Sequence, residues 1–534
     1  MIYIDPPYNT GNDFVYRDNF TVDKGEYDEE AGVYDEEGGR LFKNTETNGR
    51  FHSDWCSMMY PRLVLARNLL SSDGVMLISI DNNEFVNILK LCDEVFGEEN
   101  FITNVTWEKG RKNDSTFFSD SVEYIVFYAK NIHNLISLGA WREKKYGLDE
   151  IFNYYNKMVS VYKNDYATIE QKMKDFYNDL PEDNPAKELK HFFRSDERGL
   201  YFGADISSAS TSIPDYDIYH PVTKRPVKKP SRGWGATEPV MLKRIADNRV
   251  LFGTDETTIP LKKSYLSEVD TIVKTPVVYK DGRGASLVLK NLIGATIFNN
   301  PKDHSVLKDL FSYIFQKTKE GIVIDFFSGS ASTAHAVIEL NADDGGKRKF
   351  IMVQLPEICA EGSEAAKAGH NNICEIGKER IRRAGDKIKA EAGLTAQNLD
   401  IGFRVLKLDD TNMKDVYYAA GEYTQNLLDL ATSNIKDDRN DMDLLYGCLL
   451  DWGLPLSLPH THEKIDGVTV HTYNNGDLIA CFADTVSDKV VKEIAKRQPL
   501  RAVFRDSGFS SSPEKINVAE IFKLLAPNTS VKVI

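Results

Sequence analysis

A carboxylate, two prolines and an aromatic ring stand together in the stretch "IYIDPPYNTG", directly after an apolar segment; they are Asp5, Pro6, Pro7 and Tyr8. The prolines fix two φ angles and remove two amide donors, so the corner is rigid and leaves the Asp5 carboxylate and the Pro6 carbonyl free to accept hydrogen bonds. The Tyr8 ring offers a face on which a nucleobase can stack, worth about 1–3 kcal/mol. Two acceptors beside a stacking face suit a planar group that bears an NH2. The alternative is a strand-terminating turn with a surface aspartate.

A second stretch with binding chemistry is "GIVIDFFSGSASTAHAVIEL", which predicts a buried strand, a Gly/Ser turn and a helix. Ser328, Gly329 and Ser330 fall where that helix is expected to start, so backbone amides can approach a ligand closely. The turn lacks the full GxGxxG spacing, and no P-loop lysine follows it. These features favour a nucleoside without a diphosphate as the ligand. An ordinary strand-to-helix turn is the alternative.

The next predicted strand, "KRKFIMVQLPE", is expected to end at Glu357, with Gln354 on its polar edge. Nucleoside-binding sheets commonly place a polar group at this point to meet ribose hydroxyls. A solvated strand end is the alternative interpretation.

The surrounding segments predict an open α/β sheet. Residues 12–50 are polar, acid-rich and without periodicity, which predicts a long mobile loop that could serve as a lid. Apolar residues then recur at helical spacing, with Ser53 or Asp54 as the expected cap. The order strand, helix, strand predicts parallel strands with right-handed crossovers. The further expected elements are a strand at Val75–Asp81, a helix at Asn83–Phe96 that Gly97 stops, and a strand at Ser121–Lys130.

Two regions interrupt or follow this pattern. Residues 134–275 are rich in Tyr, Lys and Asn, helical in pattern to about residue 190 and then broken by Pro and Gly, which indicates an insertion. Toward the end, "TVHTY", an Asn-Asn-Gly turn, "LIACF", a helix near Asp488–Arg497 and "RAVFR" predict a small α/β domain.

Composition is that of a globular protein of about two to four domains, with 534 residues of which 42% are hydrophobic. No apolar run is long enough for a membrane helix and no export signal is present, so we expect a cytoplasmic location. The six cysteines are scattered without zinc spacing, which predicts reduced thiols and no metal.

Charge is segregated along the chain, although the formal net charge of −14 argues against a simple nucleic-acid binder. Residues 18–37 hold nine acids and one base, whereas residues 220–263 hold ten Lys or Arg and four acids. Solvated loops of opposite sign are the alternative to a function for either patch.

The corner "DPPYNTG", followed far downstream by "DFFSGSAST", resembles the amino-methyltransferases of DNA in their β arrangement, in which the catalytic motif precedes the S-adenosylmethionine motif. Segments such as "SVEYIVFYAK", "FNNPKDHSVLKDLF" and "LLYGCLLDWGLPLSLP" resemble the modification subunit of Type III restriction-modification systems. The resemblance implies a Rossmann-like methyltransferase sheet in circularly permuted order. It also implies a catalytic half at 1–133, a target-recognition insertion at 134–275, a cofactor-binding half at 276–394 and an assembly domain at 395–534.

The resemblance implies adenine-N6 methylation of duplex DNA by base flipping. Asp5 would accept a hydrogen bond from the exocyclic N6, the Pro6 carbonyl would accept the other N6 hydrogen, and Tyr8 would stack on the base. Two acceptors draw the amine toward tetrahedral geometry and make it a better nucleophile, so neither a covalent intermediate nor a metal is needed. Cytosine-N4 methylation remains an alternative, because the chemistry at both amines is alike.

For S-adenosylmethionine, the resemblance implies ten binding residues: Pro301, Lys302, Asp325, Phe326, Phe327, Ser328, Gly329, Ser330, Gln354 and Glu357. Ala331 stands where many relatives have a second glycine, so the loop is expected to be slightly bulkier. Relatives also carry a segment ahead of the corner, so we expect the chain to be truncated at its N-terminus. A non-catalytic DNA-recognition and assembly subunit is therefore a further alternative.

The implied partners are double-stranded DNA, a second copy of the modification subunit, and a separate ATP-driven restriction subunit. The aromatic residues Tyr219 and Trp234 either take part in the DNA surface or pack locally. The basic residues expected to contact phosphates, which position the protein without specifying sequence, are Lys224, Arg225, Lys228, Lys229, Arg232, Lys243, Arg244 and Arg249.

Overall fold

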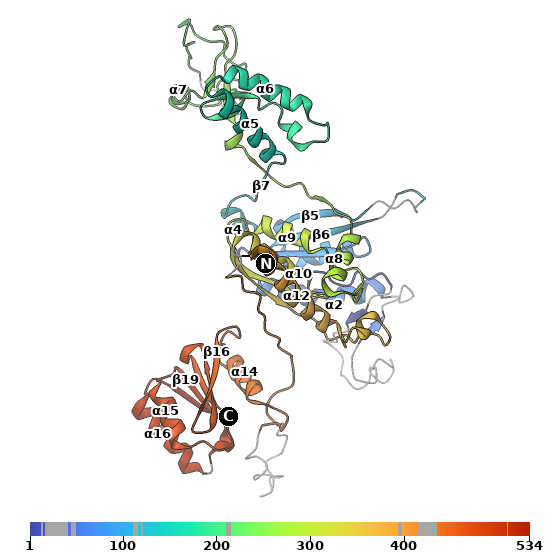
Figure 1. Ribbon diagram of the computed structural model, residues 1–534, viewed down its shortest axis with the longest axis vertical. Coiled ribbons are helices and arrows are strands. Elements are labelled where there is room, and N and C mark those ends of the chain that lie inside the picture. Colours follow the sequence, from blue (N-terminus) through green and yellow to red (C-terminus); the bar gives the residue numbers. More distant parts are fainter. Residues whose placement is uncertain are drawn as a thin grey trace. The chain divides into compact units, whose positions relative to one another are not determined.

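The computed structural model describes residues 1–11, 14–16, 41–43, 50–110, 116–118, 121–209, 215–393, 398–414, 435–509 and 511–534. The chain forms two compact units, Met1–Gly402 and Phe403–Ile534 (Figure 1). The acid-rich segment of the expected mobile loop lies outside the described residues. Two short antiparallel strands occur in the region that we expected to lack strands, β2 (Phe14–Tyr16) and β3 (Leu41–Lys43).

A seven-stranded sheet forms the centre of the first unit, in the order β13-β5-β6-β4-β1-β14-β15. β6 pairs antiparallel with β4 and β5, and the other neighbouring strands pair parallel. The strands are β1 (Ile2–Ile4), β4 (Val75–Ile80), β5 (Phe101–Glu108), β6 (Val122–Ala129), β13 (Val277–Tyr279), β14 (Glu320–Asp325) and β15 (Lys347–Met352).

The central strands are apolar on both faces because helices cover both faces. Ile2 and Ile4 pack with helices α2 (Phe51–Leu69) and α3 (Phe85–Phe96), whereas Tyr3, on the opposite face of β1, packs toward the other helices. That face is covered by α9 (His304–Ile314) and α10 (Ser332–Asp344), against which α12 (Ile373–Ala392) packs. The result is a three-layer α/β/α arrangement, as expected (Figure 1).

The expected N-cap of α2, Ser53 or Asp54, is wrong and lies three or four residues after the observed one. The helix begins at Phe51, and its N-cap residue, Arg50, makes no side-chain cap bond. Ser53 instead donates its hydroxyl to the Arg50 carbonyl, inside the first turn. The apolar spacing itself is confirmed, since Trp55 and Leu63 are fully buried.

β1 and β14 form the point at which the strand order reverses. β1 leads through α2 to β4 on one side, whereas β14 leads through α10 to β15 on the other. The two chain segments that leave these neighbouring strands therefore diverge, and a crevice opens between them. Ligands of open α/β sheets bind in such crevices, outside the carboxyl ends of the strands.

The sequence analysis missed several elements of this unit. β5 shows only partial alternation, and β13 is three residues long at the sheet edge. The others are helices α4 (Ile132–Ser137), α8 (Arg283–Ile293), α9, α11 (Glu364–Lys367) and α12.

Residues between β7 (Glu143–Lys144) and β12 (Thr271–Ile272), which pair with each other, form the insertion. Its helical part has a core of its own, where α5 and α6 pack together. The following part surrounds Trp234, which is fully buried and donates its indole N–H to the Tyr216 carbonyl at 2.9 Å. The elements are α5 (Leu148–Tyr162), α6 (Tyr166–Asp179), α7 (Glu238–Ala246), β8 (Arg194–Asp196), β9 (Gly199–Ala204), β10 (Val250–Leu251) and β11 (Leu261–Tyr265).

The second unit is a five-stranded sheet in the order β16-β17-β18-β19-β20, with helices on both faces. The expected strands, turn and helix of this region are present, and β16, β20, α14 and α16 are additional. Among the described residues, no helix has the length and apolar character needed to cross a membrane. The elements are α14 (Asp441–Asp451), β16 (His460–Ile465), β17 (Val468–Tyr473), β18 (Leu478–Cys481), α15 (Asp488–Lys496), β19 (Arg501–Phe504), α16 (Ser512–Leu525) and β20 (Ser530–Val533).

Candidate active site

One cavity of about 670 Å³ lies beside the ends of β1 and β14, within the size range of small-molecule sites. The proline corner and the Gly/Ser turn both line it, although they are far apart in sequence. The residues expected from the sequence that line it are Asp5, Pro6, Pro7, Tyr8, Pro301, Lys302, Phe327, Gly329, Gln354 and Glu357.

The proline corner is anchored from below by two neighbouring helices. Trp55, on α2, donates its indole N–H to the Pro7 carbonyl at 2.7 Å. Asn9 adopts a left-handed φ of 60° and donates to the buried Glu84 carboxylate at 2.5 Å. His52 also contacts that carboxylate, at 2.6 Å. The corner is therefore fixed on the side away from the cavity.

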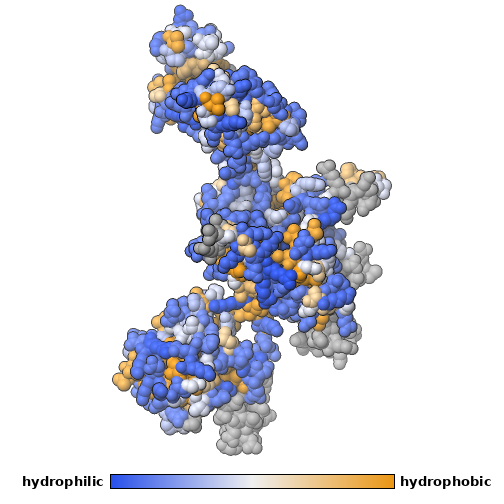
Figure 2. Space-filling view, in the orientation of Figure 1, coloured by the Kyte–Doolittle hydropathy of each residue, from blue (hydrophilic) through white to orange (hydrophobic). Residues whose placement is uncertain are grey.

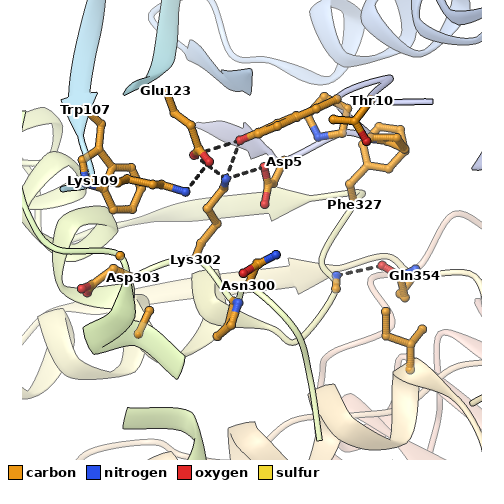
Figure 3. A pocket seen from close by; sticks show the side chains of 18 of the residues that line it. Asp5, Thr10, Trp107, Lys109, Glu123, Asn300, Lys302, Asp303, Phe327 and Gln354 are labelled. Atoms are coloured by element: carbon orange, nitrogen blue, oxygen red, sulfur yellow. Dashed lines mark hydrogen bonds and ion pairs between the residues drawn. The ribbon is translucent and has the colours of Figure 1, made fainter. Parts of the chain in front are cut away.

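A network of charges surrounds Asp5 on the cavity side (Figure 3). The Lys302 ammonium lies 3.1 Å from Asp5 Oδ1 and 2.7 Å from Glu123 Oε2. It also donates to the Tyr8 hydroxyl, which in turn donates to Glu123 at 3.1 Å. Lys109 pairs with the other oxygen of Glu123. Two lysines thus balance two carboxylates in one cluster.

Burial and the charges of oppositely charged neighbours shift the pKa values of this network in opposite directions. Burial raises the pKa of Asp5, because it outweighs the attraction of Lys302. Burial alone would also raise the pKa of Glu123, but Lys302 and Lys109 outweigh it and hold that pKa below its ordinary value. Burial would lower the pKa of Lys302, yet Asp5 and Glu123 raise it, so the lysine is charged.

Asp325 ends β14 and is almost fully buried below the Gly/Ser turn. Its carboxyl accepts hydrogen bonds from the Thr333 hydroxyl at 2.6 Å and from the Phe327 amide at 3.1 Å. Burial raises the pKa of Asp325 to about 7. These contacts make Asp325 the support of the turn, and it does not line the cavity.

The Gly/Ser turn is longer than expected, because α10 begins at Ser332 and not near Ser328. The Gly329 amide donates to the Gln354 side chain at 2.8 Å, across from β15. Ala331 adopts a left-handed φ of 61°, which an alanine tolerates only at a cost in energy. Buried Arg380, on α12, donates to the Ser330 and Ser332 hydroxyls at 2.9 and 2.7 Å. The turn is therefore held from three sides.

Besides Asp325, three more of the expected cofactor residues do not line the cavity. Phe326 packs on the apolar cluster of α2 and α3, and Ser328 and Ser330 are buried. The expected strand end at Glu357 is wrong, since β15 ends at Met352 and Glu357 follows in a loop. Glu357 reaches the cavity because that loop turns back, and its Oε1 lies 3.4 Å from the Gln354 amide nitrogen.

The sequence analysis missed Glu123, Lys109 and Arg380. A glutamate inside the apolar strand "SVEYIVFYAK" was the available signal, because a charge in a buried strand needs a partner. Lys109 follows β5 directly, so its position depended on a strand that the pattern did not reveal. Arg380 sits among other charged residues of α12 and carries no signal of its own.

The basic residues that we expected to contact phosphates differ in whether they form ion pairs with acidic side chains. Arg225, Lys229, Arg232 and Arg249 each form an ion pair with an acid of the insertion. Lys224, Lys228, Lys243 and Arg244 have no acidic partner among the residues that the structure describes. The face of the insertion seen in Figure 2 is mainly hydrophilic, with scattered apolar residues. Trp234 packs locally, whereas Tyr219 is exposed.

A doubly wound sheet with one cavity at its reversal point defines a Rossmann-like nucleoside-binding core, and sequence comparisons give its family. A family model described as DNA methylase matches residues 1–367. The Type III restriction-modification enzyme EcoP15I Mod subunit of Escherichia coli is 31% identical over 553 residues, covering 100% of this chain and 81% of that protein. The StyLTI Mod subunit of Salmonella typhimurium is 35% identical, covering 76% of this chain and 56% of its own length. The chain therefore belongs to the DNA methylase family, among the modification subunits of Type III restriction-modification systems.

Proposed function

We propose that this chain methylates the N6 amine of adenine in duplex DNA, with S-adenosylmethionine as methyl donor. The observation that carries the proposal is the shared cavity: the rigid Asp-Pro-Pro-Tyr corner and the Gly/Ser turn line it together. Family membership and the two motifs support this assignment over a non-catalytic DNA-recognition subunit.

The corner supplies two acceptors for an exocyclic amine. Asp5 directs its carboxylate to the cavity, and the Pro6 carbonyl accepts no hydrogen bond from the described residues. Both can accept the N6 hydrogens of a flipped adenine, while the Tyr8 ring stacks on the base. Flipping costs a few kcal/mol, which stacking and these hydrogen bonds offset. The amine lone pair is thereby directed at the methyl donor.

The residues around the turn fit a nucleoside-type methyl donor. Gly329 has a φ of +48° and lines the cavity, so a side chain there would strain the backbone of the turn. Phe327 offers an apolar ring, and Glu357 and Gln354 offer polar groups for hydroxyls. When bound, S-adenosylmethionine supplies an electrophilic methyl group, and its sulfur keeps the electron pair of the broken bond. The methylated N6 nitrogen then releases one proton to solvent.

The other regions have proposed roles as well. Residues 134–275 would recognise the target sequence, with the eight basic residues as phosphate contacts. Residues 395–534 would serve in assembly, with a second modification subunit and a restriction subunit as partners. These roles are supported by the similarity to Mod subunits.

Methyl transfer from tritiated S-adenosylmethionine to duplex DNA tests the proposal. Digestion of the product to nucleosides, followed by mass spectrometry, should yield N6-methyladenine; N4-methylcytosine would contradict the assignment. Asp5→Ala should lower turnover by roughly 10²–10³-fold while it spares cofactor binding, because the lost acceptor acts on the reacting amine. Asp5→Asn, which keeps the shape, is the matched variant. Wild-type turnover in both would refute the role of Asp5.

A further inference from the structure

We propose that Lys302 is a positioning residue that holds the Asp5 carboxylate and, through its hydroxyl, the Tyr8 ring in place for the target base, with Glu123 as its anchor. The inference rests on the proposed methyl transfer and assigns residues of that same site. It also moves Lys302 from the cofactor-binding role expected from the sequence to the base-binding side of the cavity.

The geometry of the ammonium group carries the inference. An ammonium has three N–H donors, and Lys302 Nζ meets three oxygens: Asp5 Oδ1 at 3.1 Å, Glu123 Oε2 at 2.7 Å and the Tyr8 hydroxyl. The Lys302 side chain is only 8% exposed. Each donor thus has a partner, and the nitrogen is held between the Asp5 carboxylate and the Tyr8 hydroxyl. Figure 3 shows Lys302 beside Asp5 and Glu123.

The backbone of Lys302 is fixed as well. Its carbonyl accepts the Ser332 hydroxyl at 2.9 Å. Pro301 precedes it, with φ fixed by its ring, and Asp303 follows it as the cap of α9, accepting from the Ser305 amide at 2.8 Å. A side chain held at both its root and its tip can position what it touches.

Glu123 and Lys109 complete the support. Glu123 lies on β6 between the two ammonium groups, with its side chain 15% exposed. Lys109 occupies the second Glu123 oxygen, so the carboxylate cannot rotate away from Lys302. Glu123 therefore anchors Lys302 without touching the cofactor turn.

The cluster predicts opposite effects on the ionisation of Asp5, which must be charged to accept from the amine. Lys302 favours the ionised form and Glu123 disfavours it. Removing the lysine should therefore shift the acid limb of the kcat profile to higher pH, and removing the glutamate charge should shift it to lower pH. The charged or titratable groups that face Asp5 are Lys302, Glu123, Lys109, Tyr3, Tyr8 and Asp325.

The test measures kcat against pH and S-adenosylmethionine affinity for Lys302→Met, Lys302→Arg, Glu123→Gln and the control Lys308→Met. Lys308 is a paired lysine on α9 that contacts Glu339 and Asp343, outside the cavity. Lys302→Met should lower kcat at least about tenfold and move the acid limb up by roughly one pH unit. Lys302→Arg should recover part of the shift, Glu123→Gln should move the limb down, and Lys308→Met should match the wild type.

Several outcomes would overturn the inference. One is a Lys302→Met enzyme with the wild-type kcat and acid limb; another is a loss of cofactor affinity with kcat intact, which would return Lys302 to the cofactor site. If circular dichroism shows that Lys302→Met does not fold, the other two variants test the inference. The result is then the direction in which Lys302→Arg and Glu123→Gln shift the acid limb of the kcat profile. A wild-type chain that methylates no DNA would instead defeat the proposed function, so the two failures are distinct.

Discussion

The bond between Trp55 and the proline corner can be broken by the substitution Trp55→Phe. The Trp55 side chain is fully buried in the cluster that α2 and α3 form with the sheet. Its N–H donates to the Pro7 carbonyl at 2.7 Å, so phenylalanine would keep an aromatic ring but lose this donor. The corner would then lose its hydrogen bond to α2 at Pro7, which lies between the two proposed acceptors and Tyr8.

Two contributions set the expected loss of local stability in Trp55→Phe. A partly buried carbonyl left without its donor costs about 1–3 kcal/mol, and the smaller ring leaves a void that costs about 1 kcal/mol more. The local free energy of opening should therefore fall by about 2–4 kcal/mol. Since about 1.4 kcal/mol is a factor of ten, amide exchange should accelerate by roughly 30- to 700-fold. A looser corner should also lower kcat by roughly ten- to a hundredfold.

Hydrogen exchange read by mass spectrometry on peptides that cover β1 and α2 measures the first effect, and methyl transfer at saturating DNA measures the second. Trp234→Phe is the matched control, because Trp234 is also fully buried and donates to a backbone carbonyl, but in the insertion. It should accelerate exchange there and leave kcat unchanged. A Trp55→Phe enzyme with faster exchange and wild-type kcat would refute the link between the indole and the chemistry.

Two further predictions concern the buried carboxyl and the basic surface. Because burial raises the Asp325 pKa to about 7 from 3.8, the folded state binds more protons than the unfolded state between pH 4 and 7, and this group makes stability fall as pH rises through that range. The free energy of unfolding of Asp325→Asn, measured by urea titration relative to that of the wild type, should therefore rise from pH 5 to pH 7. A difference between the two proteins that stays constant over this range would contradict the shifted pKa. On the insertion, replacing three lysines without acidic partners among the described residues should weaken DNA binding and reduce the slope of log K against log salt by up to about 3. The control triple removes bases that are already paired, Arg225, Lys229 and Arg232, and should have a smaller effect; an equal effect would show that pairing does not matter. The lysine triple is Lys224→Gln, Lys228→Gln and Lys243→Gln.

Local signals were sufficient for the parts of the fold with strong periodicity. The apolar repeat around Trp55 and Leu63 predicted α2, and the run from Val75 predicted β4, because burial on one or both faces leaves a plain pattern. The proline corner was recognisable for a similar reason, since proline restricts the backbone whatever surrounds it.

Long-range contacts could not be predicted in this way. Glu123 and Lys302 are 179 residues apart, and only the folded sheet brings them to the same cavity. The left-handed φ of Ala331 is imposed by the surrounding turn, and alanine itself gives no hint of it. The ion pairs of Arg225 and Arg249 likewise depend on acids that the tertiary structure places beside them.

The pairing of β1 with β14 has a consequence for how the chain folds. The Met1 amine donates to the carbonyl of Ile322, 321 residues later, and Ile2 is in register with Ile324. Such a contact closes a very long loop. The conformational entropy of that loop must be lost before the pairing of β1 with β14 contributes to stability. The insertion has its own apolar clusters and can become ordered while that loop is still open. We therefore expect the two sides of the crevice beside β1 and β14 to meet late in folding, after the segment between them has already folded.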